Sequence, residues 1–202
     1  MKNSMQSATF APMNAPFPTP SQLERHRFTI DDVLKMTAQG LIDKRTELLD
    51  GEIYDMPSDG DAHIEFTMRL AQQAMATLLG KPYFVGVQTT LRLSTHNAPS
   101  PDIYVLAGGA PKGEIPSDRI LLVIEVADTS LADDLKDSAS RYARHGVRDY
   151  WVVDVNARAI HVHRDPKGGA YPPPRKLNAS ETVAALLIPG LTVTLDSLPG
   201  PD

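Results

Sequence analysis

The chain contains no cysteine, which excludes disulfide bonds and thiolate metal sites. It has a single tryptophan, and aromatic residues make up only 6% of its 202 residues. No apolar run approaches the about 20 residues that a membrane-spanning helix requires. The N-terminus also lacks the basic-then-apolar order of a secretory signal. These absences lead us to expect a cytoplasmic protein that crosses no membrane.

Charge of one sign does not dominate, because the formal net charge is only −5. An acidic balance argues against nonspecific coating of nucleic acid, although it leaves room for a local basic groove. Between residues 141 and 176, eight lysine and arginine residues stand against three aspartates. That excess is compatible with a phosphate-facing surface, and also with a solvated helix and hairpin.

The length and the ordinary composition predict one domain with a substantial core. Residues 1–27, rich in proline, serine and threonine, predict a flexible N-terminal arm. Residues 28–195 form the predicted domain, and residues 196–202 a short C-terminal tail.

Periodicity and turn residues predict mixed helices and strands along this domain. A short helix over 31–36, capped by Thr29, precedes a hairpin over 46–56 that turns at Asp50-Gly51. A long helix follows, with His63 in its first turn on the buried stripe. Strands are predicted over 83–88, 90–93, 102–106, 120–126, 150–153, 159–163 and 191–195. Residues 168–174 indicate a connector, and the apolar run 183–187 stays unassigned.

Two carboxylates interrupt the strand-like runs near the middle of the chain. Asp102 opens the run DIYVL, and Glu125 lies inside ILLVIEV. A carboxylate in a buried strand is costly unless it is paired or binds a cation. Glu125 either faces water from an edge strand, or the two acids share one divalent metal, which prefers oxygen ligands.

The residues after Glu125 indicate a strand–helix–strand unit. The run Asp128-Thr129-Ser130 supplies candidate N-caps, and a helical stripe runs from Leu131 through Leu135 and Ala139 to Tyr142. Gly146 provides a helix stop before the strand at 150–153. A parallel pair of strands joined by a helix is the simplest interpretation.

At this point the chain resembles the PD-(D/E)XK nuclease superfamily, and within it the Uma-type restriction endonucleases. The resemblance covers about residues 28–195 and depends on an ordered set of motifs. They are Glu47-Leu48-x-Asp50-Gly51-Glu52, His63, Pro101-Asp102, Ile124-Glu125-Val126 and Tyr142-Ala143-x-x-Gly146-Val147-x-x-Tyr150-Trp151-x-Val153-Asp154.

The resemblance implies a restriction-endonuclease-like α/β core, a central mixed sheet flanked by helices. It implies Mg²⁺, with Mn²⁺ as a substitute, and cleavage of phosphodiester bonds in DNA. Asp102 and Glu125 correspond to the metal ligands, and Glu47 to an upstream acid that completes the shell. His63 matches a histidine near the same site. From the residues alone, Glu47 also fits a surface charge, and His63 a structural histidine.

One position departs from the family pattern. Ser138 stands four residues before Tyr142, where the resemblance leads us to expect a catalytic lysine. Lys136 lies on the same helix but points to its outward side, because each residue turns the helix by about 100°. Arg141 lies closer to Ser138 around the helix and is the better substitute. The candidates for this role are therefore Ser138, Lys136 and Arg141.

The sequence thus predicts a metal-dependent DNA endonuclease that is weakened by the missing lysine. Two alternatives remain: a non-catalytic DNA-binding or dimeric interaction protein of the same fold, and a hydrolase of another phosphoester. A two-fold homodimer is also expected, since this is the commonest soluble oligomer.

Overall fold

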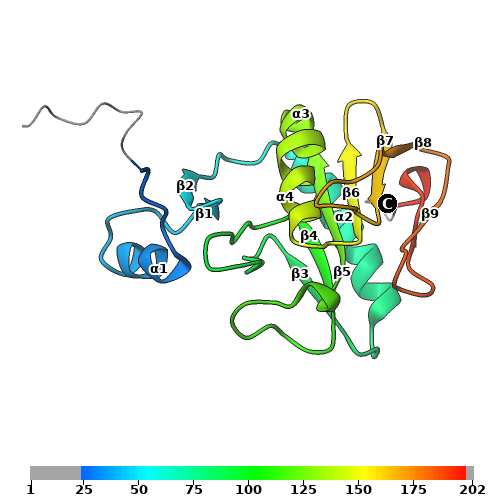
Figure 1. The fold of residues 1–202 in the computed structure, drawn as a ribbon. Coiled ribbons are helices and arrows are strands. Elements are labelled where there is room, and N and C mark those ends of the chain that lie inside the picture. Colours follow the sequence, from blue (N-terminus) through cyan, green and yellow to red (C-terminus); the bar gives the residue numbers. More distant parts are fainter. Residues whose placement is uncertain (1–23, 199–202) are drawn as a thin grey trace, which may run out of the picture.

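The computed structural model describes residues 24–198, so most of the predicted arm and tail, residues 1–23 and 199–202, lies outside the described residues. Its centre is a six-stranded sheet in the order β3-β4-β5-β6-β7-β8 (Figure 1). All neighbouring strands are antiparallel except β5 and β6. The strands are Tyr83–Val87, Ile103–Ala107, Ile120–Ala127, Asp149–Asp154, Ala159–Arg164 and Arg175–Asn178. The predicted mixed sheet flanked by helices is confirmed.

A helical crossover joins the parallel strands β5 and β6, as predicted. It consists of α3 (Leu131–Asp133), a π-helical turn η3 (Asp134–Ser138) and α4 (Ala139–Arg144). Gly146 ends the crossover with a φ of 74°, in the left-handed region that glycine adopts readily. The π-helical turn was not predicted, and such turns are frequent at functional sites.

The two faces of the sheet bury separate cores. Helix α2 (Asp61–Leu78) covers one face, and the α3–α4 crossover covers the other (Figure 1). Ile124 and Val126 of β5 join the core under α2, whereas Val123 and Ala127 join the core under α4. Because side chains alternate along a strand, Glu125 faces the same side as α4.

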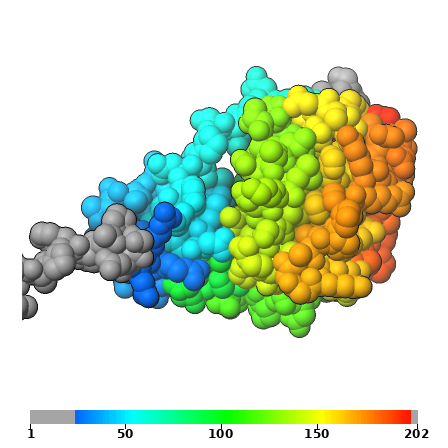
Figure 2. All heavy atoms as spheres, turned by 45° about the horizontal axis from the view of Figure 1, so that its top comes forward, coloured from blue at the N-terminus to red at the C-terminus, as the bar shows by residue number. Residues whose placement is uncertain are grey.

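A small N-terminal lobe lies beside the sheet, formed by α1 (Ile30–Ala38) and the hairpin β1 (Thr46–Leu49) and β2 (Glu52–Asp55). Figures 1 and 2 show this blue-to-cyan lobe next to the green crossover. The predicted turn is confirmed: Asp50 and Gly51 both have positive φ angles, 51° and 85°. Ala98 N donates to Leu48 O at 2.7 Å, which ties the hairpin to the segment before β4.

Two stretches differ from the sequence prediction. Residues 90–93 form no strand; Leu91 and Leu93 are buried, but their N–H groups donate across a local loop to Pro99 O and Asn97 O. Strand β8 was missed, because only Leu177 of its four residues is buried and no apolar alternation marks it. The remaining elements are short: η2 (Ser117–Arg119), β9 (Val183–Ala184), β10 (Thr192–Val193) and η4 (Leu195–Ser197).

The basic segment from Arg141 to Lys176 is largely neutralised by ion pairs. Arg148 pairs with Asp165 at 2.7 Å, and Arg164 pairs with the fully buried Asp149 at 2.8 Å. Further pairs are Arg144–Asp50, Arg158–Asp196 and Arg175–Glu181. This pairing favours the solvated-surface interpretation over a phosphate-binding face.

Within residues 24–198, none of the helices combines the length and the apolar character needed to cross a bilayer.

His163 is buried between two tyrosines. Its ring centroid lies 5.5 Å from that of Tyr150 and 5.3 Å from that of Tyr171. It is 4% exposed, and its Nε2 has no hydrogen-bond partner among the described residues. Burial, together with nearby His161, lowers the pKa of His163 to about 4. The folded state therefore holds this imidazole neutral.

We predict that His163→Phe makes the protein less sensitive to acid. The folded pKa lies below the unfolded value of 6.5, so the unfolded state binds the proton first as the pH falls. The contribution of the neutral His163 side chain to the free energy of unfolding is complete above pH 6.5. It decreases as the pH falls toward 4, by at most about 3 kcal/mol. Urea unfolding at several pH values should give a flatter curve for the variant. Parallel curves for the two proteins would contradict the assignment.

Candidate active site

Asp102 and Glu125 meet where β4 and β5 lie side by side. The register pairs Ile103 with Ile124, which places Asp102 opposite Glu125. Asp102 N donates to Glu125 Oε2 at 3.1 Å, and Val126 N donates to Asp102 Oδ2 at 2.8 Å. β5 is an inner strand between β4 and β6, so the interpretation of Glu125 on an edge strand is wrong.

These two acids line a cleft of about 200 Å³, here called the acidic cleft. Its walls come from the β1–β2 hairpin, the start of α2, the segment before β4 and the α3–α4 crossover. Of the predicted site residues, it contains Glu47, His63, Asp102, Glu125, Ser138 and Arg141. The fold therefore brings together residues that are up to about a hundred positions apart in the chain.

Negative charge is crowded in the acidic cleft. Burial raises the pKa of Glu125 well above its usual value, and the charges of Asp102 and Asp134 raise it further. The Asp102 N–H and the Tyr142 hydroxyl oppose this by donating hydrogen bonds to the carboxylate. The site therefore has an excess of carboxylate charge that a cation would relieve.

Tyr142 orients the Glu125 carboxylate. Its hydroxyl donates to Glu125 Oε1 at 2.8 Å, and the residue is only 1% exposed. Burial and the nearby Glu125 charge raise the Tyr142 pKa well above its usual value, so the hydroxyl keeps its proton. The sequence marked Tyr142 as a motif and core residue, but not as a hydrogen-bond donor to Glu125.

His63 holds the other carboxylate. Its Nε2 lies 3.0 Å from both oxygens of Asp102, and its Nδ1 lies 3.7 Å from Asp59 Oδ1. The hydrogen bond to Asp102 is the main cause of a raised His63 pKa, which burial partly offsets. An imidazolium is thus favoured beside Asp102.

Glu47 reaches the acidic cleft from β1. Its Oε1 accepts a hydrogen bond from Ser100 N at 2.5 Å. Burial raises the pKa of Glu47, and the nearby Asp102 adds to the effect, whereas Ser100 N–H and Arg141 lower it. Glu47 is therefore not the free surface charge that the sequence left as an alternative.

The structure separates the three candidates for the cationic role. Ser138 and Arg141 line the acidic cleft, and the Arg141 side chain is only 11% exposed. Lys136 does not line it: its side chain is 84% exposed and its Nζ lies 3.7 Å from Asp137 Oδ1. The π-helical turn does not bring Lys136 inward, so Lys136 as a site residue is a wrong prediction.

Asp134 is a site residue that the sequence reasoning missed. It accepts hydrogen bonds from Ser130 Oγ at 2.6 Å and from Ser138 Oγ at 3.3 Å. Burial raises its pKa to about 6. The signal was present, because Ser130, Asp134 and Ser138 recur every four residues and so share one helix face.

The donor chemistry fits a hard divalent ion. Mg²⁺ is usually held by one or two carboxylates together with waters and substrate phosphates, and Asp102 and Glu125 supply two. In residues 24–198, no group of three or more histidine, aspartate or glutamate side chains is gathered closely enough to form a complete cage. Two facing carboxylates with a third nearby still suit an ion that keeps part of its water shell.

The fold of this chain is similar to that of a protein of known structure. A solved structure from Anabaena variabilis ATCC 29413, described as "a putative nuclease belonging to DUF820", superposes with a TM-score of 0.60. The match covers 86% of this chain and 94% of the other at 14% sequence identity, which shows a shared fold. A search of curated proteins finds no significant match.

A family model described as "Putative restriction endonuclease" matches residues 31–196. The matched region includes both strands that carry the facing acids, the hairpin with Glu47 and the whole crossover. The resemblance drawn from the sequence motifs is thereby confirmed, and the chain belongs to the Uma2 family.

Proposed function

We propose that this chain is a metal-dependent endonuclease that hydrolyses phosphodiester bonds of DNA in the acidic cleft. The observation that carries the proposal is the pair Asp102 and Glu125, which face each other across neighbouring segments of the sheet. Asp102 N donates to the Glu125 carboxylate, and the Asp102 carboxylate accepts from the N–H of Val126, the residue after Glu125. The family description and the nuclease-like fold of the Anabaena protein support it.

Asp102 and Glu125 would hold Mg²⁺ or Mn²⁺, with Glu47 as a third oxygen donor, directly or through water. When bound, such an ion polarises the phosphate and makes an attacking water more acidic. Tyr142 and His63 each fix one of the two carboxylates, so the oxygen donors are positioned before substrate enters.

Arg141 is the group that would meet the charge of the phosphate. Its guanidinium lies in the wall of the acidic cleft, and its Nε has no hydrogen-bond partner among the described residues. A fixed guanidinium stabilises developing negative charge in a site that excludes water. Its Nε lies 3.6 Å from Asp50 Oδ2, which limits how far the side chain can move toward the substrate.

Ser138 makes the proposed enzyme weak. A lysine in its place would extend an ammonium group into the acidic cleft, whereas the serine hydroxyl only reaches Asp134. None of the residues lining the acidic cleft is a lysine. This observation favours the second candidate function, a nuclease-fold protein that binds DNA without cutting it.

We predict that Glu125→Gln stabilises the metal-free protein. The pKa of Glu125 is higher in the folded state than in the unfolded state, so ionisation of this carboxyl destabilises the fold. Stability is therefore lost as the pH rises above 4.5. Glutamine keeps an oxygen for Asp102 N–H and an amide for the Tyr142 hydroxyl. In EDTA at pH 8, urea unfolding should show a gain of about 1 kcal/mol.

The same variant tests the metal. Addition of Mg²⁺ should raise the melting temperature of the parent and leave that of Glu125→Gln unchanged, because one ligand is lost. Glu114→Gln, which removes an exposed glutamate outside the acidic cleft, should behave like the parent in both measurements. An equal Mg²⁺ response in parent and Glu125→Gln would argue against this site.

We predict that Ser138→Lys increases metal-dependent nicking of supercoiled plasmid, by up to about 10²-fold. Asp102→Asn, combined with it, should abolish the gain, because one metal ligand is removed. Arg141→Ala should lower the residual activity of the parent. Lys136→Ala is the matched control and should change nothing, since Lys136 points into solvent.

Two outcomes would revise the proposal. If Ser138→Lys folds and gains stability with Mg²⁺ yet cuts no DNA, the non-catalytic function is favoured. If the parent already cuts as fast as Ser138→Lys, then Arg141 supplies the required cation, and Arg141→Ala should remove most of the rate.

A further inference from the structure

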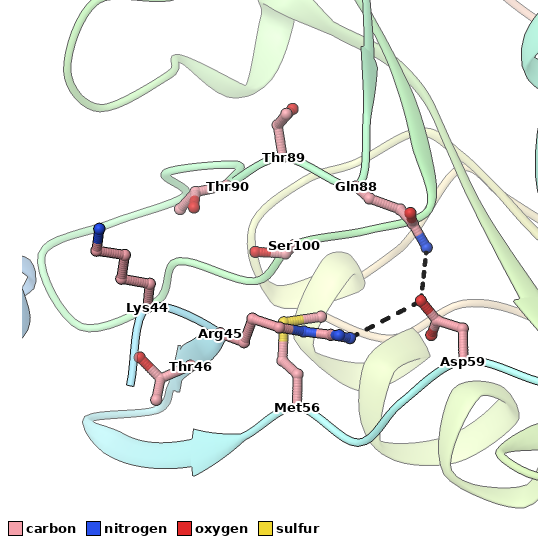
Figure 3. Close-up of a pocket in the computed structure, with 9 residues that line it drawn as sticks. All are labelled: Lys44, Arg45, Thr46, Met56, Asp59, Gln88, Thr89, Thr90 and Ser100. Atoms are coloured by element: carbon pink, nitrogen blue, oxygen red, sulfur yellow. Dashed lines mark hydrogen bonds and ion pairs between the residues drawn. The ribbon is translucent and has the colours of Figure 1, made fainter. Parts of the chain in front are cut away.

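A second cavity of about 510 Å³ opens beside the acidic cleft (Figure 3). We call it the flanking cavity. Its walls carry two basic side chains, Lys44 and Arg45, together with four hydroxyl side chains and the amide of Gln88. Met56 is its only apolar lining residue, which makes the cavity unsuited to an apolar ligand.

The flanking cavity adjoins the acidic cleft. Met56, Asp59 and Ser100 line both spaces. Ser100 also donates its N–H to Glu47 and lies two residues before Asp102, so one short segment forms a wall of both cavities. A chain-like ligand with one group at Asp102 and Glu125 would therefore place its neighbouring group in the flanking cavity.

Several groups in this wall are already oriented. Arg45 Nη2 donates to Pro57 O at 3.0 Å and lies 3.9 Å from Asp59 Oδ2. Gln88 Nε2 donates to the same Asp59 oxygen at 3.2 Å and lies 3.4 Å from Asp102 Oδ1. Figure 3 shows both contacts converging on Asp59, whose negative charge they offset.

The backbone of Gln88 is strained. Its φ is 46°, in a region that non-glycine residues seldom adopt. Its N–H donates to Asp102 O at 3.0 Å, so the unusual conformation is held by the same segment that carries the first acid. Strain of this kind concentrates at sites that bind a ligand.

We propose that the flanking cavity binds a phosphate group of the DNA strand next to the phosphate held at the acidic cleft. This rests on the proposed function, whose substrate it extends over two adjoining positions. Lysine, arginine, threonine and serine side chains are the usual partners of nucleic-acid phosphates. Lys44 supplies the mobile charge, since it makes no ion pair within the described part of the chain, and the hydroxyl of Thr90 supplies a neutral donor.

The test is DNA binding without cleavage. A fluorescein-labelled 20-base-pair duplex is titrated with protein in EDTA, and its anisotropy is followed at several salt concentrations. Lys44→Ala should weaken binding by about 3- to 10-fold and lower the salt slope by about one. Thr90→Val, which keeps the volume but removes the hydroxyl, should weaken binding with little change of slope. Lys112→Ala is the matched control, because Lys112 is exposed and lines neither cavity.

The outcomes separate this proposal from the nuclease function. If the parent nicks plasmid but Lys44→Ala and Thr90→Val bind the duplex like the parent, the phosphate site is wrong and the nuclease stands. If the parent binds DNA through Lys44 but never cuts, the site stands and the nuclease fails. A parent that binds no duplex overturns the phosphate site.

An independent observation concerns the outer side of α2. Four of its side chains are large, apolar and exposed: Ile64 (47%), Met68 (59%), Met75 (48%) and Leu79 (85%), the last just after the helix end. At 100° per residue they fall within an arc of about 60°, beside the buried stripe of the helix. They form one apolar ridge, here called the α2 ridge.

The α2 ridge is self-complementary. Ile64 and Leu79 lie equally far from its centre, as do Met68 and Met75, and the acidic Asp61 and the basic Lys81 lie near opposite ends. A second copy that runs antiparallel would place Met68 on Met75, Ile64 on Leu79 and Asp61 near Lys81. Such a two-fold arrangement is the usual geometry of a homodimer.

We infer that the α2 ridge is a dimerisation surface for a second copy of this chain. Sedimentation at micromolar concentration should show a dimer, and Met68→Lys should raise its dissociation constant at least about tenfold by placing two charges in the interface. The double variant Met68→Lys and Met75→Glu should dimerise again, because antiparallel helices bring the new lysine of one copy onto the new glutamate of the other.

Circular dichroism checks that each variant is folded. A parent that stays monomeric, or a dimer that Met68→Lys leaves intact, would overturn this surface. Recovery in the double variant is specific to the antiparallel pairing, because a parallel pairing would bring like charges together.

Discussion

The hydrogen bonds that join the carboxylates of Asp102 and Glu125 to the backbone of the opposing segment are the constraint on which the site depends. Each carboxylate accepts a backbone N–H from the opposing strand, so the side chains take part in the pairing of β4 with β5. The acids are thereby fixed by the backbone of the central sheet. Crowding of the two carboxylates destabilises the fold when no cation is bound. Local destabilisation of this kind is typical of sites at which binding compensates for it.

The other elements each position one partner of these two acids. The first turn of α2 brings His63 to Asp102, and α4 brings Tyr142 to Glu125. The N-terminal hairpin closes the cleft with Glu47, and it is held in turn by Arg141 and Arg144 of the crossover through Asp50. The arginines of this segment, for which the sequence left a phosphate-facing surface open, are thus mostly engaged in ion pairs within the protein.

Much of this was predictable because it is local. The Asp-Gly turn, the capped α1, the stripe of α2 and the strand–helix–strand unit each leave a pattern in consecutive residues. Residues 90–93 and β8 were mispredicted because their backbone partners lie elsewhere in the chain and their burial shows no alternation. The π-helical turn was also missed, because Leu131, Leu135 and Tyr142 keep the apolar spacing of an ordinary α-helix.

The sequence by itself determined the fold class, the identity of the two facing acids and the absence of a lysine at position 138. It could not determine which charges meet, because that depends on strand register and on how two lobes pack. Only the tertiary structure placed Glu47 in the cleft, turned Lys136 to solvent, added Asp134 and opened a second polar cavity beside the acids. Side chains separated by tens of residues come together only when the sheet and the hairpin are assembled, and a local sequence pattern does not predict such long-range contacts.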